Sequence, residues 1–204
     1  MRGTMRVTAA IFALLMATGT AQARSADHNR LWAFVRHTTA IREGRGPVRL
    51  YVFFDPNCPY CHALYETLQP IIRSQGLGVR WVPVGILALS SYGKAAALLE
   101  AAHPAAAMAR MEAGFHGGRG AIRPRRATAP VARALLYNIH LFEAAGAQGV
   151  PFLVYKTRAD HVHTVTGEPP ATVLADIASR IAPARRSPKS TPQTATPRRQ
   201  GPRL

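Results

Sequence analysis

The chain contains only two cysteines, Cys58 and Cys61, which are separated by two residues in the segment Cys-Pro-Tyr-Cys. A disulfide that closes so short a loop restricts the unfolded chain very little, so it would contribute little to stability. The pair is therefore better explained by redox chemistry or by metal binding than by a structural cross-link. Both functions require a fold that holds the two sulfurs at one place.

The residues around the pair predict a strand, a helix and a second strand. Residues 48–54 are almost continuously apolar, as in a strand covered on both faces. Pro59 is tolerated in the first turn of a helix, and apolar residues recur at helical spacing over 59–75. A further apolar run covers 79–84. The cysteine pair thus lies at the start of the helix in a βαβ unit.

The rest of the chain extends this unit to a recognisable order of elements. Residues 90–143 are rich in alanine and helical in pattern. Two short strands, 152–155 and 162–166, and a closing helix, 172–181, follow. The order βαβ, helical insertion, ββα predicts an α/β thioredoxin fold. We expect the thioredoxin-like domain to span 48–182, with a helical insertion over about 88–148.

The two ends of the chain differ from this body. Residues 1–23 combine two arginines, an apolar run of about a dozen residues and Ala21-Gln22-Ala23, which predicts a cleaved signal peptide and export to the periplasm. Residues 24–47 are expected to form a linker with an amphipathic helix over 27–42. Residues 183–204 are basic and rich in proline, without acidic residues, which predicts a disordered tail.

The formal net charge of +16 makes the chain strongly cationic. Acidic proteins, an anionic membrane surface or nucleic acid could each match that charge. No segment at helical spacing resembles a groove-reading motif, so we do not expect nucleic-acid binding.

The position of the cysteines predicts how they would react. Unpaired amides and the helix dipole at the start of a helix stabilise an anion, so Cys58 is predicted to be the nucleophilic thiolate. Cys61, one turn later, would be the resolving thiol that releases the substrate from a mixed disulfide. Pro59 and Tyr60, between the cysteines, would set the geometry and polarity of the substrate-binding surface.

Val150-Pro151 is the predicted second part of the site. In a thioredoxin fold, the proline that opens the third strand is cis and faces the cysteine pair. Val150 would then offer a free backbone edge to an extended substrate segment, a form of strand addition. An ordinary trans turn before a strand is the alternative.

Residues near the cysteine pair and a histidine pair farther along the chain are also candidates for the site. A protonated His62 could favour the thiolate, or it could point to solvent. Asp55 is expected to cap the turn between strand and helix. His161 and His163 are the pair that a zinc site would need, but both fall on an exposed hairpin without two further ligands, so we expect no metal and no cofactor.

Residues 48–61, Val-Arg-Leu-Tyr-Val-Phe-Phe-Asp-Pro-Asn-Cys-Pro-Tyr-Cys, resemble the active-site segment of the periplasmic disulfide isomerase and chaperone family known as DsbG and DsbC. The resemblance is closer to DsbG, which also carries Cys-Pro-Tyr-Cys. It implies that Cys58 is the attacking thiol, Cys61 its partner and Pro151 the cis-proline. Val150 stands where these isomerases usually carry threonine, and valine there is more like the oxidase DsbA.

The resemblance also predicts a difference. Members of this family carry an N-terminal dimerisation domain before the linker helix, and we expect this chain to lack it and to be monomeric. The leading hypothesis is a thiol–disulfide oxidoreductase or isomerase that acts on exported proteins with cysteines or disulfides, served by a membrane or periplasmic redox partner. A non-catalytic thioredoxin-fold binding module and a metal chaperone are the alternatives. The sequence does not give the direction of the redox reaction.

Overall fold

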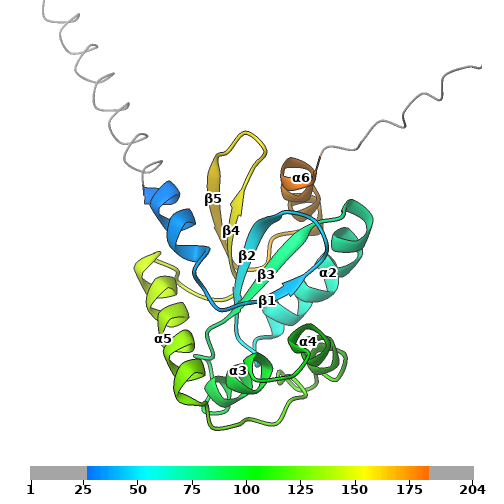
Figure 1. Ribbon diagram of the computed structural model, residues 1–204. Helices are drawn as coiled ribbons and strands as arrows, with labels where there is room; N and C mark the ends of the chain where they lie inside the picture. Colours follow the sequence, from blue (N-terminus) through cyan, green and yellow to red (C-terminus); the bar gives the residue numbers. More distant parts are fainter. Residues whose placement is uncertain (1–26, 184–204) are drawn as a thin grey trace, which may run out of the picture.

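A computed structural model describes residues 27–183, which form a five-stranded mixed sheet with helices on both faces (Figure 1). The predicted signal peptide and all but the first residue of the predicted tail lie outside this range. The strand order is β1-β3-β2-β4-β5, and only β2 and β3 are parallel neighbours. The strands are β1 (Ile41–Glu43), β2 (Val48–Phe54), β3 (Gly78–Pro83), β4 (Phe152–Lys156) and β5 (Val162–Thr166).

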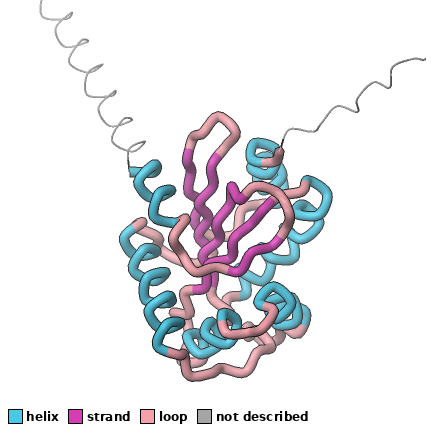
Figure 2. The backbone as a smooth tube through the Cα atoms, in the orientation of Figure 1, coloured by secondary structure: helices cyan, strands magenta, loops and turns pink. Residues whose placement is uncertain are grey.

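The helices confirm the predicted α/β thioredoxin fold. A first helix covers residues 27–35. The others are α2 (Pro59–Gln75), α3 (Ser91–Leu99), α4 (Pro104–Ala113), α5 (Ala129–Ala144) and α6 (Ala171–Ile181). Figure 2 shows that the loops joining α3, α4 and α5 gather beyond one end of the sheet. None of the described helices is both long and apolar enough to cross a bilayer.

Strand β2 is buried on both faces, as its continuous apolar run predicts. Leu50, Val52 and Phe54 point into the core that contains residues of α2 and α6. Tyr51 and Phe53 point into a second core, shared with the first helix and α5. Alternation along the strand thus fills two cores at once. These contacts hold the carboxyl end of β2, which leads into the cysteine pair, in a fixed position.

The predicted helix over residues 27–42 is wrong in its second half. The helix ends at Val35, and Ile41–Glu43 forms β1, antiparallel to β3. The carboxylate of Glu43 accepts hydrogen bonds from the side chains of Tyr65, Gln69 and Trp81, so β1 is held by groups from α2 and β3. Long-range contacts of this kind override a local helical pattern.

Candidate active site

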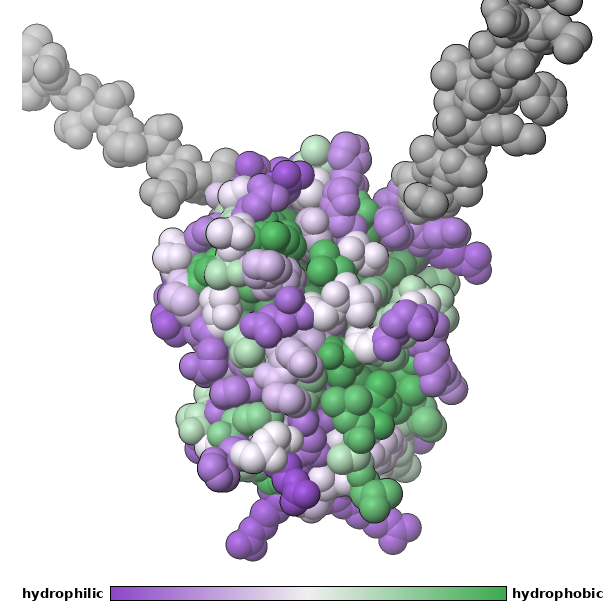
Figure 3. Space-filling model, turned by 180° about the vertical axis from the view of Figure 1, so that it is seen from behind, coloured by the Kyte–Doolittle hydropathy of each residue, from purple (hydrophilic) through white to green (hydrophobic). Residues whose placement is uncertain are grey.

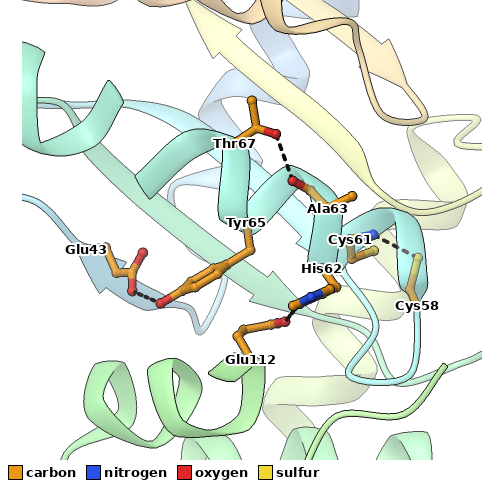
Figure 4. Close-up of polar contacts among 8 residues, drawn as sticks. All are labelled: Glu43, Cys58, Cys61, His62, Ala63, Tyr65, Thr67 and Glu112. Atoms are coloured by element: carbon orange, nitrogen blue, oxygen red, sulfur yellow. Dashed lines mark hydrogen bonds and ion pairs between the residues drawn. The ribbon is translucent and has the colours of Figure 1, made fainter. Parts of the chain in front are cut away.

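The cysteine pair lies at the amino end of α2, and Cys58 is itself the N-cap residue of the helix. Its Sγ accepts a hydrogen bond from the backbone N–H of Cys61 at 3.2 Å (Figure 4). The turn is shaped by Pro59 at the first helical position, where a missing N–H costs nothing. The sulfur of Cys58 therefore takes the place that the oxygen of a serine or aspartate usually fills at a helix start.

The environment gives the two thiols opposite acidities. The thiol of Cys61 and the N–H groups of Cys61 and Tyr60 hydrogen-bond to Cys58, and they lower the pKa of the Cys58 thiol although burial and the charge of Asp55 oppose them. Burial and the neighbouring Cys58 raise the pKa of Cys61 far above its ordinary range. The site can thus hold a thiolate on Cys58 beside a protonated Cys61.

The chain returns to this site at Val150 and Pro151. The Val150–Pro151 peptide bond is cis, and the carbonyl oxygen of Val150 lies 3.5 Å from the Sγ of Cys58. Pro151 is buried and Val150 half-buried. Residues separated by 92 positions in the sequence therefore meet at one sulfur.

Pro59 and Tyr60 are exposed, and Tyr60 keeps 64% of its surface accessible, whereas Cys58 exposes only 2%. A partner could therefore reach the reacting sulfur only by contacting the residues around it.

Asp55 does more than cap a turn. Its carboxylate is buried and accepts four hydrogen bonds, from the N–H groups of Asn57, Ile86 and Leu87 and from the hydroxyl of Ser91. The bonds to Ile86 and Leu87 attach the loop between β3 and α3 to the cysteine turn. Asp55 therefore organises the surface beside the cysteines as well as the turn that leads to them.

The loop held by Asp55 is apolar at the surface. Ile86, Leu87 and Leu89 are all exposed, Leu89 completely. Seen from behind, apolar side chains gather over the lower part of the molecule, toward the end where α3 lies (Figure 3). Exposed apolar surface beside a reactive group is a common feature of sites that receive other proteins.

His62 does not point to solvent. Its Nδ1 lies 2.8 Å from Oε2 of Glu112, a buried residue of α4 (Figure 4). Its ring stacks on Phe115 with centroids 4.4 Å apart. Burial raises the pKa of Glu112, and the hydrogen bond from His62 opposes that rise. The pair links the first turn of α2 to the helical insertion.

Glu112 is a residue of the site that its sequence pattern marks only ambiguously. Glu112 follows Met108 by four residues, so it continues the buried side of α4 that Met108 and Met111 begin. A single acid on an apolar helix face can equally lie at the edge of that face.

The histidines considered as metal ligands do not join the cysteines. His163 lies in β5 opposite Tyr155 of β4, and the two rings stack. Tyr155 is four residues after Pro151 in the sequence. Within residues 27–183, no group of three or more His, Cys, Asp or Glu side chains is arranged to hold a metal ion.

Comparison with known proteins agrees with this geometry. A family model described as the thioredoxin-like domain matches residues 36–182. The chain is 31% identical over 150 residues to the thiol:disulfide interchange protein DsbG of Pseudomonas aeruginosa, covering 72% of this chain. It is 27% identical over 147 residues to DsbG of Escherichia coli, covering 71% of this chain. The chain spans 58% of the length of each of these relatives.

Solved structures show the same fold. The catalytic domain of Proteus mirabilis ScsC matches with a TM-score of 0.59 at 21% identity, over 78% of this chain and 96% of that domain. Helicobacter pylori DsbG matches with a TM-score of 0.53 at 22% identity, over 76% of this chain and 72% of that protein.

Proposed function

The chain belongs to the thioredoxin-like domain family, and we propose that it is a DsbG-like thiol–disulfide oxidoreductase that works through Cys58 and Cys61. The observation that carries this proposal is the contrast between the two thiols. Hydrogen bonds lower the pKa of Cys58, while burial raises that of Cys61. A nucleophile and a protonated partner at one helix start suit disulfide exchange better than passive binding.

The reaction follows from these two states. The Cys58 thiolate attacks one sulfur of a substrate disulfide, whose other sulfur leaves as a thiolate, and a mixed disulfide forms. Cys61 then gives its proton to the released thiolate and attacks the Sγ of Cys58. The second substrate sulfur leaves, so the substrate is reduced by two electrons and the cysteine pair becomes a disulfide. The reverse sequence oxidises a substrate dithiol. Isomerisation needs no net oxidation: the thiolate released from the substrate attacks a second substrate disulfide, and the thiolate freed there displaces Cys58 from the mixed disulfide, so the cysteine pair ends reduced.

Substrate contacts would come from the exposed surface around Cys58. Tyr60 and Pro59 border the sulfur, and the segment at Val150 and Pro151 lies on its other side. An extended chain placed along Val150 would bring its own sulfur close to Cys58. The apolar loop at Leu87 and Leu89 would hold apolar parts of a partly unfolded protein.

The substrates in this proposal are exported proteins with cysteines or disulfides, and a periplasmic or membrane redox partner would restore the pair. This placement in the periplasm is supported by the signal-peptide pattern of residues 1–23 and by a solved periplasmic thioredoxin-like protein of Salmonella enterica serovar Typhimurium, similar in fold. We also propose that the chain acts as a monomer, which sedimentation would test.

Trapping the mixed disulfide is the direct test. Cys61→Ser should stop the second attack, so Cys58 should remain bound to a disulfide-containing protein such as insulin, visible as a band that dithiothreitol removes. Cys58→Ser should give no such band and no insulin reduction. If Cys58→Ser keeps the full activity or Cys61→Ser traps nothing, the proposal is wrong, and a non-catalytic binding module becomes the better explanation.

A further inference from the structure

Lys94 is a buried lysine directly behind the cysteine loop. It lies in α3 with 6% of its surface exposed. Its Nζ donates to the side-chain oxygen of Asn57 and to the carbonyl oxygen of Gly120, both at 2.7 Å. Lysine is almost never buried without partners, because desolvation of an ammonium is costly. The burial of Lys94 and its two specific hydrogen bonds therefore suggest that its charge has a role at this turn.

Both partners of Lys94 belong to the turn that presents Cys58 or contact it. Asn57 directly precedes Cys58, and its amide group also donates to the hydroxyls of Ser90 and Ser91. The N–H of Gly120 donates to the carbonyl oxygen of Pro56 at 2.9 Å. The ammonium thus joins α3, the segment after α4 and the cysteine turn at one point.

The buried carboxylate of Asp55 creates an electrostatic conflict at this turn. Its four hydrogen bonds hold the loop in place, yet its negative charge raises the pKa of Cys58 and of Cys61. A negative charge close to the nucleophile disfavours a second one on the sulfur. The carboxylate of Asp55 therefore stabilises the loop through its hydrogen bonds but disfavours a thiolate on Cys58 through its charge.

Lys94 lies where it can resolve that conflict. Burial and the charge of Arg119 lower the pKa of Lys94, while the attraction of Asp55 raises it, so the two buried charges interact. The groups that link them are neutral: Asn57 hydrogen-bonds to both Asp55 and Lys94, and Ser91 hydrogen-bonds to Asp55 and to Asn57.

We propose that Lys94 is a positioning residue for thiol–disulfide exchange, because its ammonium holds Asn57 in place and offsets the charge of Asp55, so that Cys58 can remain a thiolate. This inference rests on the proposed function only in that it takes Cys58 as the reacting sulfur.

The pH profile of Cys58 alkylation tests this role. Iodoacetamide modification of the reduced full-length chain is followed by mass spectrometry, which assigns the label to Cys58. Lys94→Met should move the midpoint of the profile to higher pH and slow alkylation about fivefold to tenfold at a pH below that midpoint. Lys156→Met is the matched control, because it removes a half-buried lysine that pairs with exposed Asp160, and it should leave the profile unchanged.

A double variant separates charge from packing. Asp55→Asn alone should lower the midpoint, and Asp55→Asn combined with Lys94→Met should return it toward that of the unaltered chain. Lys94→Gln keeps a hydrogen-bond donor but loses the charge, so it should shift the midpoint upward as Lys94→Met does. If both single variants at Lys94 remain folded by circular dichroism with an unchanged midpoint, Lys94 is only structural and the inference is wrong.

A measurement on the unaltered chain guards against loss of folding in the variants. With isotope-labelled lysine, the Nζ resonance of Lys94 should shift when Cys58 is alkylated, because the neighbouring charge is lost, and an unmoved resonance overturns the inference. Thiol acidity is measured without any protein substrate. A midpoint shift together with a failed mixed-disulfide trap would therefore reject the proposed function, while the effect of Lys94 on the acidity of Cys58 would stand.

Discussion

The carboxylate of Glu112 in α4 lies 2.8 Å from Nδ1 of His62 in α2, so the helical insertion touches the residue that directly follows Cys61. Glu112 is 3% exposed, and the ring of His62 is further fixed by stacking on Phe115. Together with Lys94 and Gly120, this contact shows that the insertion surrounds the start of α2 rather than merely extending the domain.

Glu112→Gln should change how stability depends on pH. Burial raises the pKa of Glu112 in the folded chain. The folded state then binds this proton more readily than the unfolded state, so the contribution of Glu112 is fully present below its unfolded pKa and is lost as the pH rises through its folded pKa. The free energy of unfolding of Glu112→Gln, relative to that of the unaltered chain, should therefore increase as the pH rises above the ordinary pKa range of glutamate.

Urea unfolding at a series of pH values measures this difference. Glu143→Gln, on an exposed position of α5 and not among the charges that act on Glu112, controls for the loss of one acidic charge. A difference for Glu112→Gln that stays flat across the series would contradict the prediction.

Asp55→Ala should destabilise the chain strongly. It leaves the N–H groups of Ile86, Leu87 and Asn57 and the hydroxyl of Ser91 without their acceptor. The cost should be about 2–4 kcal/mol in urea unfolding. Asp160→Asn, which removes a surface charge and keeps a side chain that tolerates the positive φ at this position, should cost little. Equal losses for the two variants would mean that the Asp55 hydrogen bonds contribute little.

Gly120→Ala should also be destabilising, although it adds a single methyl group. A Cβ at position 120 would lie 2.5 Å from the carbonyl oxygen of Pro56 and 2.7 Å from Cγ of Met111. Relief of that overlap requires movement of the cysteine turn, at a cost of about 1–3 kcal/mol in urea unfolding. Gly149→Ala meets no atom within 4 Å and should be neutral or slightly stabilising. A neutral Gly120→Ala would show that the two segments separate easily.

Leu89→Ser should lower activity toward proteins without lowering stability. Leu89 is fully exposed in the loop that Asp55 anchors, so its apolar surface is available to a partner. The rate with an unfolded protein disulfide should fall about threefold to tenfold, while the rate with oxidised glutathione should not change. Leu136→Ser, on exposed α5, is the control. A parallel fall with both substrates would point instead to damage at Cys58.

The sequence predicted the centre of the fold well because local signals there agree. Strand β2 and helix α2 have the same bounds as predicted, since Pro59 marks the start of the helix and Gly76, in a left-handed conformation, marks its end. The sequence failed at β1, because Ile41–Glu43 becomes a strand only beside the free edge of β3 and through the hydrogen bonds of Glu43.

The same contrast between local signals and long-range contacts explains why the site was predicted only in part. Cys58 and Cys61 lie within four residues of each other in the sequence, and Val150–Pro151 followed from the order of elements. Lys94 could not be found in this way, because one charged residue in an alanine-rich helix looks like any solvent-facing position. Its role depends on Asn57 and Gly120, which lie 37 and 26 residues away.

The insertion meets the cysteine turn and the first turn of α2 through a lysine, a glutamate, a glycine and two serines, and none of these belongs to a strand of the sheet. Relatives could therefore diverge in how strongly they donate or accept electrons by exchanging a few insertion residues while the cysteines and the sheet beneath them stay the same. Chimeras that swap this segment between two such domains would offer a practical route to catalysts with graded reducing power.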